Sequence, residues 1–164
     1  MNGIRTCKTR AGLSSINKTD TELVIWKRSF PSSFQDWINH TDAENLPDVR
    51  ILVNPIELRL ALEPLLDLCG LMADNMRGQL VNDIKGLVNL FAQVTQSNAV
   101  DVRLQRITNN SCWKFHRDVV KTRLVTTYRG PTTEWVQHAQ AEQAILEQLS
   151  YRAVSYTHLR AHET

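Results

Sequence analysis

Hydrophobic and polar positions divide this chain into a helical first half and an extended second half, with the change near residue 99. The clearest helix is expected from Asp74 to Gln96, where apolar residues recur at spacings of three and four along one face. That stripe consists of Met76, Leu80, Ile84, Leu87, Phe91 and Val94, widened by Val81 and Val88. A stripe of this kind predicts a helix that packs against a hydrophobic core.

Two shorter helices are predicted earlier in the chain. The first should begin at Ser32 or Ser33, because a serine hydroxyl can cap the free N–H groups of a first turn. The second should start at about Pro55, a residue suited to the first helical position, and end at Gly70, which suits a C-terminal cap. Pro64 predicts a kink or a break inside this second helix.

Beyond Val100 the pattern becomes extended. Apolar and polar residues alternate over residues 100–104, which predicts a half-buried strand. Residues 122–128 are rich in Thr, Val and Tyr and predict another strand, closed by a tight turn at residues 129–132. Residues 139–149 contain good helix formers. We therefore expect an α+β domain, with a helical N-terminal half packed on an incomplete antiparallel sheet of jelly-roll (double-stranded β-helix) type.

Composition and charge are those of a single folded domain. Hydrophobic residues make up 42% of the 164 residues and charged residues 22%, close to the usual values of about 45% and 25%. The formal net charge of +2 is too small to favour a nucleic-acid or anionic-membrane partner. Residues 1–18 combine basic with small polar residues and are expected to be a frayed, flexible lead-in.

Cysteine usage and hydropathy favour a reduced, cytoplasmic setting. The three cysteines are odd in number and widely separated, so they indicate no disulfide framework. No apolar run approaches the roughly 18 residues that a membrane span needs, and the N-terminus lacks the apolar centre of a signal peptide.

The C-terminal stretch from Val154 to Thr164, VSYTHLRAHET, looks like the translation of a transposase sequencing adapter. We therefore expect the natural sequence to end near Ala153 and to be cut short there, which leaves residues 19–153 as one truncated domain. The two histidines of the tail, His158 and His162, are accordingly not counted as ligands.

The densest group of reactive side chains lies between Cys112 and Trp135. His116 and Asp118 are two residues apart, and on an extended segment such residues point to the same side. They are candidates for two ligands of one metal ion, because a non-haem iron(II) site needs two histidines and one carboxylate. The alternative is a hydrogen-bonded surface pair with no metal.

The residues around this motif carry two resemblances. His116-Arg117-Asp118 followed by Arg123-Leu124-Val125-Thr126-Thr127-Tyr128 is similar to the corresponding run of prolyl-hydroxylase-like 2-oxoglutarate oxygenases. Over roughly residues 15–152, the chain resembles the bacterial DUF1826 family, whose function is uncharacterised. That second resemblance rests on Ile25-Trp26-Lys27-Arg28, on Cys112-x-x-Phe115-His116-x-Asp118 and on Thr127-Tyr128-Arg129-Gly130-Pro131-x-Thr133-Glu134-Trp135. Thr132 departs from it, because members tend to have glycine there.

The resemblances imply a metal-binding domain related to Fe(II)/2-oxoglutarate-dependent oxygenases. His116 and Asp118 would bind the metal, with Cys112 as a further candidate, and a third ligand would follow beyond the end of this chain. A chain without that ligand is expected to be inactive. Arg123 or Arg129 offers a guanidinium for an acidic cosubstrate, although each also fits a solvated strand residue.

The remaining residues of this segment have structural explanations beside the functional ones. Tyr128 would line the cosubstrate pocket or form a cross-strand pair. The turn motif comprises Gly130, Pro131, Thr133, Glu134 and Trp135, and its tryptophan is expected in the core.

A zinc-binding accessory protein is the alternative function. Cys112, His116 and Asp118, with His138, are residue types that Zn(II) accepts. The family resemblance also implies a link to zinc homeostasis and to GTPases that resemble zinc metallochaperones. The substrate, a small molecule or a protein, is not specified by these residues, and a third reading is an interaction domain in which His-x-Asp is structural.

Overall fold

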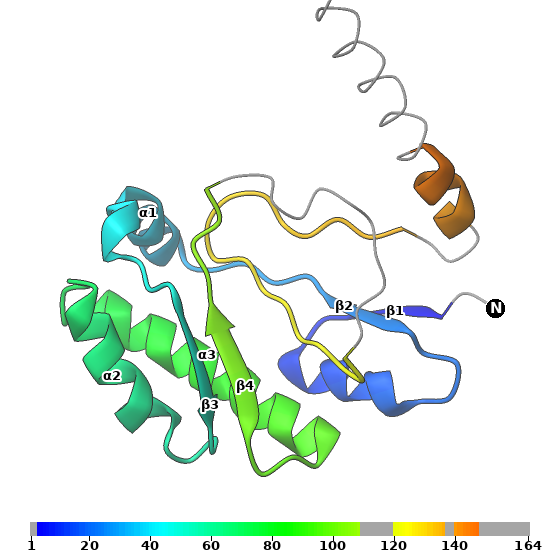
Figure 1. Cartoon of the computed structure of the whole chain (residues 1–164), viewed down its shortest axis with the longest axis horizontal. Helices are drawn as coiled ribbons and strands as arrows, with labels where there is room; N and C mark the ends of the chain where they lie inside the picture. Colours follow the sequence, from blue (N-terminus) through cyan, green and yellow to red (C-terminus); the bar gives the residue numbers. More distant parts are fainter. Residues whose placement is uncertain (1–2, 109–119, 137–139, 148–164) are drawn as a thin grey trace, which may run out of the picture.

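The computed structural model describes residues 3–108, 120–136 and 140–147. They form the mixed α+β fold that the sequence predicts (Figure 1). In chain order the elements are β1 (Ile4–Cys7), the 3-10 helix η1 (Arg10–Asn17), β2 (Leu23–Trp26), α1 (Ser32–His40), the 3-10 helix η2 (Ala43–Asn45), β3 (Val49–Val53), α2 (Leu58–Leu68), α3 (Asn75–Thr95) and β4 (Val100–Leu104). Residues 141–147 form a further helical stretch, inside the helix expected at 139–149.

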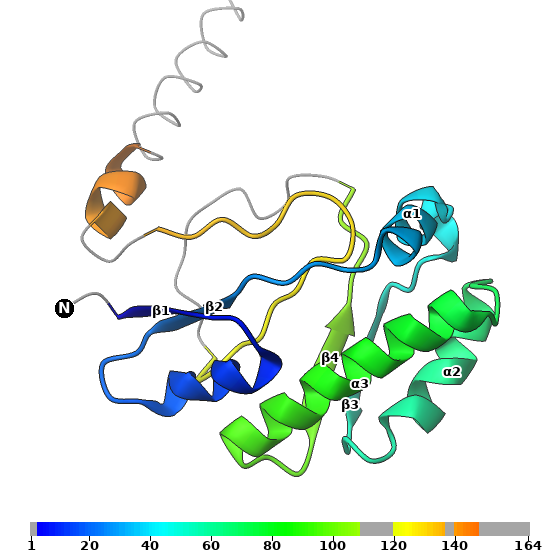
Figure 2. The same ribbon diagram turned by 180° about the vertical axis from the view of Figure 1, so that it is seen from behind.

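The described strands form two separate two-stranded sheets. β1 and β2 are parallel and are connected through η1, whereas β3 and β4 are antiparallel, with Val49 opposite Leu104 and Val53 opposite Val100. β4 therefore confirms the strand predicted from alternation. Helices α2 and α3 cover one face of the β3–β4 sheet (Figure 2). The outer face carries an ion pair between Arg50 and Asp101, 2.6 Å apart.

Helix α3 provides the centre of the core, as its apolar stripe predicts. Its buried residues include Leu80, Val81, Ile84, Leu87 and Val88. Buried side chains of α2 and of the β3–β4 sheet pack against them, namely Leu58, Leu62, Leu66, Val53, Val100 and Val102. The helix begins behind Asp74, whose side chain accepts a hydrogen bond of 2.7 Å from the backbone N–H of Arg77.

Helix α1 begins at Ser32, so Ser32 and Ser33 lie inside the helix and neither is the predicted cap. Pro31 occupies the cap position, and neither it nor Ser32 supplies a side-chain cap hydrogen bond to the first turn. Phe34 and Ile38 are buried on the inner face.

Helix α2 begins three residues later than predicted, at Leu58. Residues 55–57 form a turn, in which the side chain of Asn54 accepts a hydrogen bond of 3.0 Å from the N–H of Ile56. The helix continues through Pro64, where the sequence predicted a kink or a break. Its end is as predicted: Gly70 adopts a left-handed φ of 79°, and the N–H of Leu71 donates to the carbonyl of Leu66 at 3.0 Å.

Arg77 joins α2 to α3 from within the protein. It is the buried charged residue among those described, and all five of its guanidinium N–H groups are used. They donate to the carboxylates of Glu63 and Asp67 and to the carbonyl groups of Glu63 and Leu71, at 2.6 to 3.1 Å. Burial acts to lower the pKa of Arg77, but its hydrogen bonds to Asp67 and Glu63 outweigh burial and raise it.

Helix α2 is also apolar on its outer face. Solvent-exposed apolar residues recur every four positions along this side, at Ile56, Leu60, Pro64, Leu68 and Met72. The buried residues of the same helix, Leu58, Leu62 and Leu66, have the same spacing. Both faces of α2 therefore follow a helical apolar pattern, and only one of them contacts the described core.

Two predicted segments differ from the structure. The expected flexible lead-in contains strand β1 and helix η1, because residues 4–7 pair with 23–26 and Arg10 forms an ion pair with Asp83. The strand predicted at 122–128 is wrong: among the described residues this segment has no ladder partner, and it is held instead by side-chain contacts of Thr126 and Tyr128. The described residues thus confirm the α+β class and do not include a jelly-roll sheet.

Candidate functional site

The predicted metal ligands Cys112, His116 and Asp118 lie outside the described residues, as does His138. Within the described ranges, no three His, Cys, Asp or Glu side chains come close enough to hold a metal ion. The structure does, however, bring Tyr128 into a polar cluster that the sequence did not predict. This cluster consists of Asp83, Arg10, Arg28, Thr126 and Tyr128, and we call it the Asp83 cluster.

Asp83 lies at the centre of this cluster, because its carboxylate joins α3 to Arg10, Arg28 and Tyr128. Its side chain is only 15% exposed. Arg28 Nη1 donates to both carboxylate oxygens, at 2.8 and 2.7 Å, and the hydroxyl of Tyr128 donates to Oδ2 at 2.7 Å. Arg10 adds a longer contact, 3.2 Å from Nη2 to Oδ1. The carboxylate is therefore fully hydrogen-bonded without any bound ligand.

Arg28 is fixed on several sides. Its Nη2 donates to the hydroxyl of Thr126 at 2.7 Å, and its side chain is 13% exposed. The guanidinium carbon lies 4.5 Å from the ring centre of Phe30 and 5.1 Å from that of Trp26, within the range of cation–π attraction. Arg28 thus serves to hold Asp83 and residue 126 together.

Tyr128 is a partly buried hydrogen-bond donor. Burial raises the pKa of its phenol well above the ordinary value of 10.0, and the negative charge of Asp83 raises it further. Its ring packs 5.5 Å from that of Phe30, and its carbonyl accepts a hydrogen bond of 3.1 Å from Gln35 Nε2. The phenol therefore stays protonated and supports Asp83, so its observed contacts are structural. Its predicted role toward a cosubstrate stays a prediction.

Arg129 and the turn after it anchor helix α1. Arg129 Nη1 donates to the carbonyl of Thr41 at 2.7 Å, just beyond the last turn of α1. Gly130 follows with a left-handed φ of 85°, which a residue with a side chain rarely adopts. Pro131, Thr133, Glu134 and Trp135 are all exposed, so the expectation that the tryptophan fills the core is wrong. Arg123 is exposed as well.

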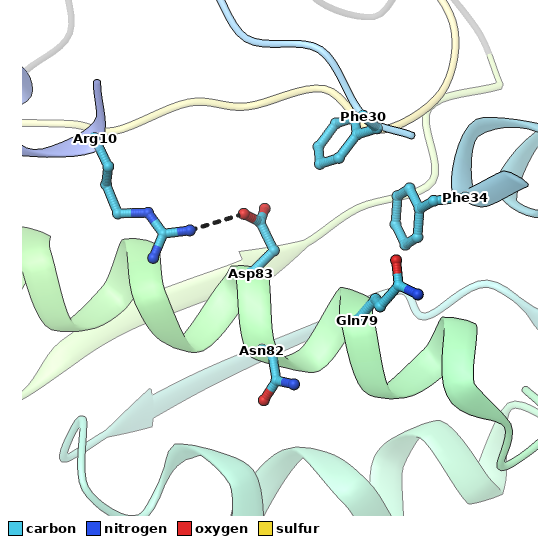
Figure 3. Close-up of a pocket in the computed structure, with 6 residues that line it drawn as sticks. All are labelled: Arg10, Phe30, Phe34, Gln79, Asn82 and Asp83. Carbon is cyan, nitrogen blue, oxygen red and sulfur yellow. Dashed lines mark hydrogen bonds and ion pairs between the residues drawn. The ribbon is translucent and has the colours of Figure 1, made fainter. Parts of the chain in front are cut away.

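An open pocket of about 400 Å³ lies beside Asp83 (Figure 3). Its walls are the rings of Phe30 and Phe34 on one side and residues of α3 on the other, and Arg10 reaches in from η1. The full lining is Arg10, Phe30, Phe34, Gln79, Asn82 and Asp83. Neither Arg123 nor Arg129 is part of it. The pocket thus combines aromatic rings, the amide of Gln79 and a partly exposed guanidinium.

Arg10 occupies space that a glycine leaves open. A methyl group added at Gly86 of α3 would lie 2.6 Å from Arg10 Cζ, closer than side-chain atoms approach one another. A glycine inside a helix costs about 1 kcal/mol relative to alanine, so Gly86 is a feature that needs a packing reason. One local feature of the sequence therefore indicates this site, namely the glycine at position 86 inside the helix with the clearest apolar stripe. Arg28 belongs to the Ile25-Trp26-Lys27-Arg28 motif noted above.

Fold and site define this chain as a small α+β domain in which one partly buried carboxylate, that of Asp83, joins the N-terminal segment, the central helix and residues 126–128. Its sequence places it in a family. The chain belongs to the family described as "Protein of unknown function (DUF1826)", whose model matches residues 8–163, and this confirms the resemblance seen in its motifs. No curated protein and no solved structure matches the chain significantly. In the part of the chain that the structure describes, no helix is long and apolar enough to cross a membrane.

Proposed function

We propose that this chain is a metal-binding domain in which His116 and Asp118 supply two ligands of an Fe(II) ion. The observation that supports it is the His-x-Asp motif with the residues that follow it. Thr126 and Tyr128, eight and ten residues after Asp118, are bonded to Arg28 and Asp83 and so belong to a fixed framework. The segment that follows the motif is therefore held in place at Thr126 and Tyr128. A metal site requires ligands that are supported by such fixed neighbours.

The chemistry of this proposal is that of a 2-oxoglutarate-dependent oxygenase. A histidine and a carboxylate, with one further ligand, would hold Fe(II) and leave positions open for a 2-oxo acid and dioxygen. The proposal includes a jelly-roll sheet, of which β3 and β4 would be two strands, and a cytoplasmic setting. Arg123 and Arg129 both stay candidates for the acidic cosubstrate, and Arg129 also donates to the carbonyl of Thr41 at the end of α1.

Metal titration tests this proposal directly. The metal-free protein is titrated with Fe(II) without oxygen, and separately with Zn(II), by isothermal calorimetry. We expect one ion per chain, and a loss of affinity of at least about 100-fold in His116→Ala and in Asp118→Ala. His40→Ala is the matched control, because the Nδ1–H of His40 only donates to the carbonyl of Asp36 within α1, at 2.7 Å.

Turnover decides between the two functions. Fe(II)-dependent consumption of 2-oxoglutarate with formation of succinate, in a chain that includes the third ligand, supports the oxygenase; affinity alone does not decide, because most sites of this kind bind Zn(II) more tightly than Fe(II). Zn(II) binding that depends on Cys112 and His116, without turnover, supports the zinc accessory protein instead. If neither ion binds, or if His116→Ala binds as the unaltered protein does, the metal proposal is rejected.

A further inference from the structure

We infer that the pocket beside Asp83 binds a small organic carboxylate, with Arg10 as the residue that meets its charge. The first argument is the balance of charge in the Asp83 cluster. Asp83 brings one negative charge and receives three short hydrogen bonds, two from Arg28 and one from Tyr128. Arg28 alone neutralises it, so the positive charge of Arg10 is in excess at the pocket.

The second argument is that the protein satisfies Arg10 poorly. Its ion pair with Asp83 is long, at 3.2 Å, while the Arg28 pair measures 2.7 Å. Its Nε is buried and has no hydrogen-bond partner among the residues that the structure describes. Buried N–H groups nearly always have a partner, and 42% of the Arg10 side chain remains accessible to solvent. Arg10 therefore keeps donor capacity that a ligand can use.

The third argument is that Gly86 leaves room for the guanidinium of Arg10 beside α3. The open space at Gly86 receives its guanidinium beside the axis of α3, and the ring of Trp26 lies 6.0 Å from its Cζ atom. Helix α3 would be more stable with alanine at this position, in the absence of Arg10. The glycine thus lets Arg10 lie beside the pocket at a cost to the helix.

The lining defines the rest of the ligand. A guanidinium pairs best with a carboxylate, and the partly exposed ring of Phe30, packed 5.0 Å from the buried ring of Phe34, favours an apolar or aromatic body attached to it (Figure 3). Gln79 adds an amide group beside Phe34, whereas the side chain of Asn82 points away from the rings and its Oδ1 accepts a hydrogen bond of 2.6 Å from Arg59. The volume of about 400 Å³ suits a small molecule. None of these residues belongs to the His-x-Asp motif, so ligand binding at the pocket can be tested separately from metal binding.

Phenylacetate is a suitable probe, because it joins a carboxylate to a phenyl ring. Its binding is followed by NMR titration, beside phenylacetamide, which has a similar shape without the charge, and inorganic phosphate, which has charge without the ring. We expect phenylacetate to bind at least tenfold more tightly than either. Arg10→Met should weaken phenylacetate binding at least tenfold, and Gly86→Ala, whose methyl group displaces Arg10, should do the same.

Gly78→Ala is the matched control. It lies in the same helix, and an added methyl group there meets no atom within 4 Å, so affinity should not change. Equal binding of phenylacetate and phenylacetamide, or no saturable binding of phenylacetate in the millimolar range, overturns the proposal. So does a folded Gly86→Ala that binds as the unaltered protein does, a result that stands even if Arg10→Met fails to fold. Equal binding of phosphate would reject the apolar half of the site.

Discussion

Replacing Arg77 with methionine should lower the free energy of unfolding by about 3 kcal/mol, whereas Arg59→Met should lower it by less than about 1 kcal/mol. Both arginines form an ion pair with Glu63, at 2.6 Å for Arg77 and 3.1 Å for Arg59. They differ in burial, because the Arg77 side chain is 5% exposed and that of Arg59 is 44% exposed. The pair of variants therefore measures what burial adds to one carboxylate contact.

The magnitude follows from what each change leaves behind. Methionine keeps much of the apolar stem of Arg77 and loses all five donors. A hydrogen bond to a charged group contributes about 1.5–3 kcal/mol, and such values do not add. Asp67 and Glu63 are 67% and 34% exposed, so both carboxylates can turn to water and no charge is stranded. The carbonyl of Leu71 cannot turn to water, because Leu71 is buried. Its lost hydrogen bond keeps the decrease in the free energy of unfolding at about 3 kcal/mol.

Urea denaturation and thermal unfolding of the two variants check this reasoning. For a chain of this size, a loss of 3 kcal/mol corresponds to a fall in Tm of roughly 6–12 °C. The urea dependence of the unfolding free energy should stay constant, since the core surface is the same. An Arg77→Met protein within about 1 kcal/mol of the original, or an Arg59→Met protein that loses as much, would refute the claim that the buried contacts of Arg77 join the two helices.

Two further predictions concern Tyr128 and Gln96. Burial and the charge of Asp83 raise the pKa of Tyr128 in the folded state, so the folded protein keeps this proton at pH values where the unfolded chain loses it. The contribution of the Tyr128 phenol to the free energy of unfolding is therefore complete below about pH 10 and is lost above it. Urea denaturation at several pH values should show the stability difference between the original protein and Tyr128→Phe shrinking above about pH 10; a constant difference would contradict this. Gln96 ends α3 with a φ of 53°, so Gln96→Gly should raise stability by about 1 kcal/mol in thermal unfolding. Gln93→Gly, inside the helix and exposed, should lower it by a similar amount, and a loss in both variants would show that no strain is relieved at Gln96.

Local pattern predicted the helices well and their environment less well. The extent of α3 followed from its single apolar stripe, and Gly70 correctly marked the end of α2. For α2 itself, Leu62 and Leu60 belong to two apolar rows with the same period, and only the first row is buried. Periodicity shows that such a segment is helical, but it cannot decide which of two similar faces meets the core.

The Asp83 cluster was missed because its contacts are distant in sequence. Arg28 and Thr126 are 98 residues apart, and Arg10 and Asp83 are 73 apart. No local pattern connects such positions, and a lone aspartate in a helix is most simply explained as a solvated residue. The strand predicted at residues 122–128 was wrong for a related reason. The composition of this segment suits a strand, but the hydrogen bonds that hold Thr126 and Tyr128 are made by side chains.

The Asp83 cluster also sets the order in which the molecule can be completed during synthesis. Helix α3 and both arginines leave the ribosome long before Tyr128, so until then Asp83 lacks one of its donors and the rings of Phe30 and Phe34 lack their cover. A nascent chain or proteolytic fragment that stops near residue 108 therefore presents an aromatic surface beside a carboxylate that lacks one of its four hydrogen bonds. The smallest fragment with a closed N-terminal half has to extend through Arg129, which also anchors the end of α1.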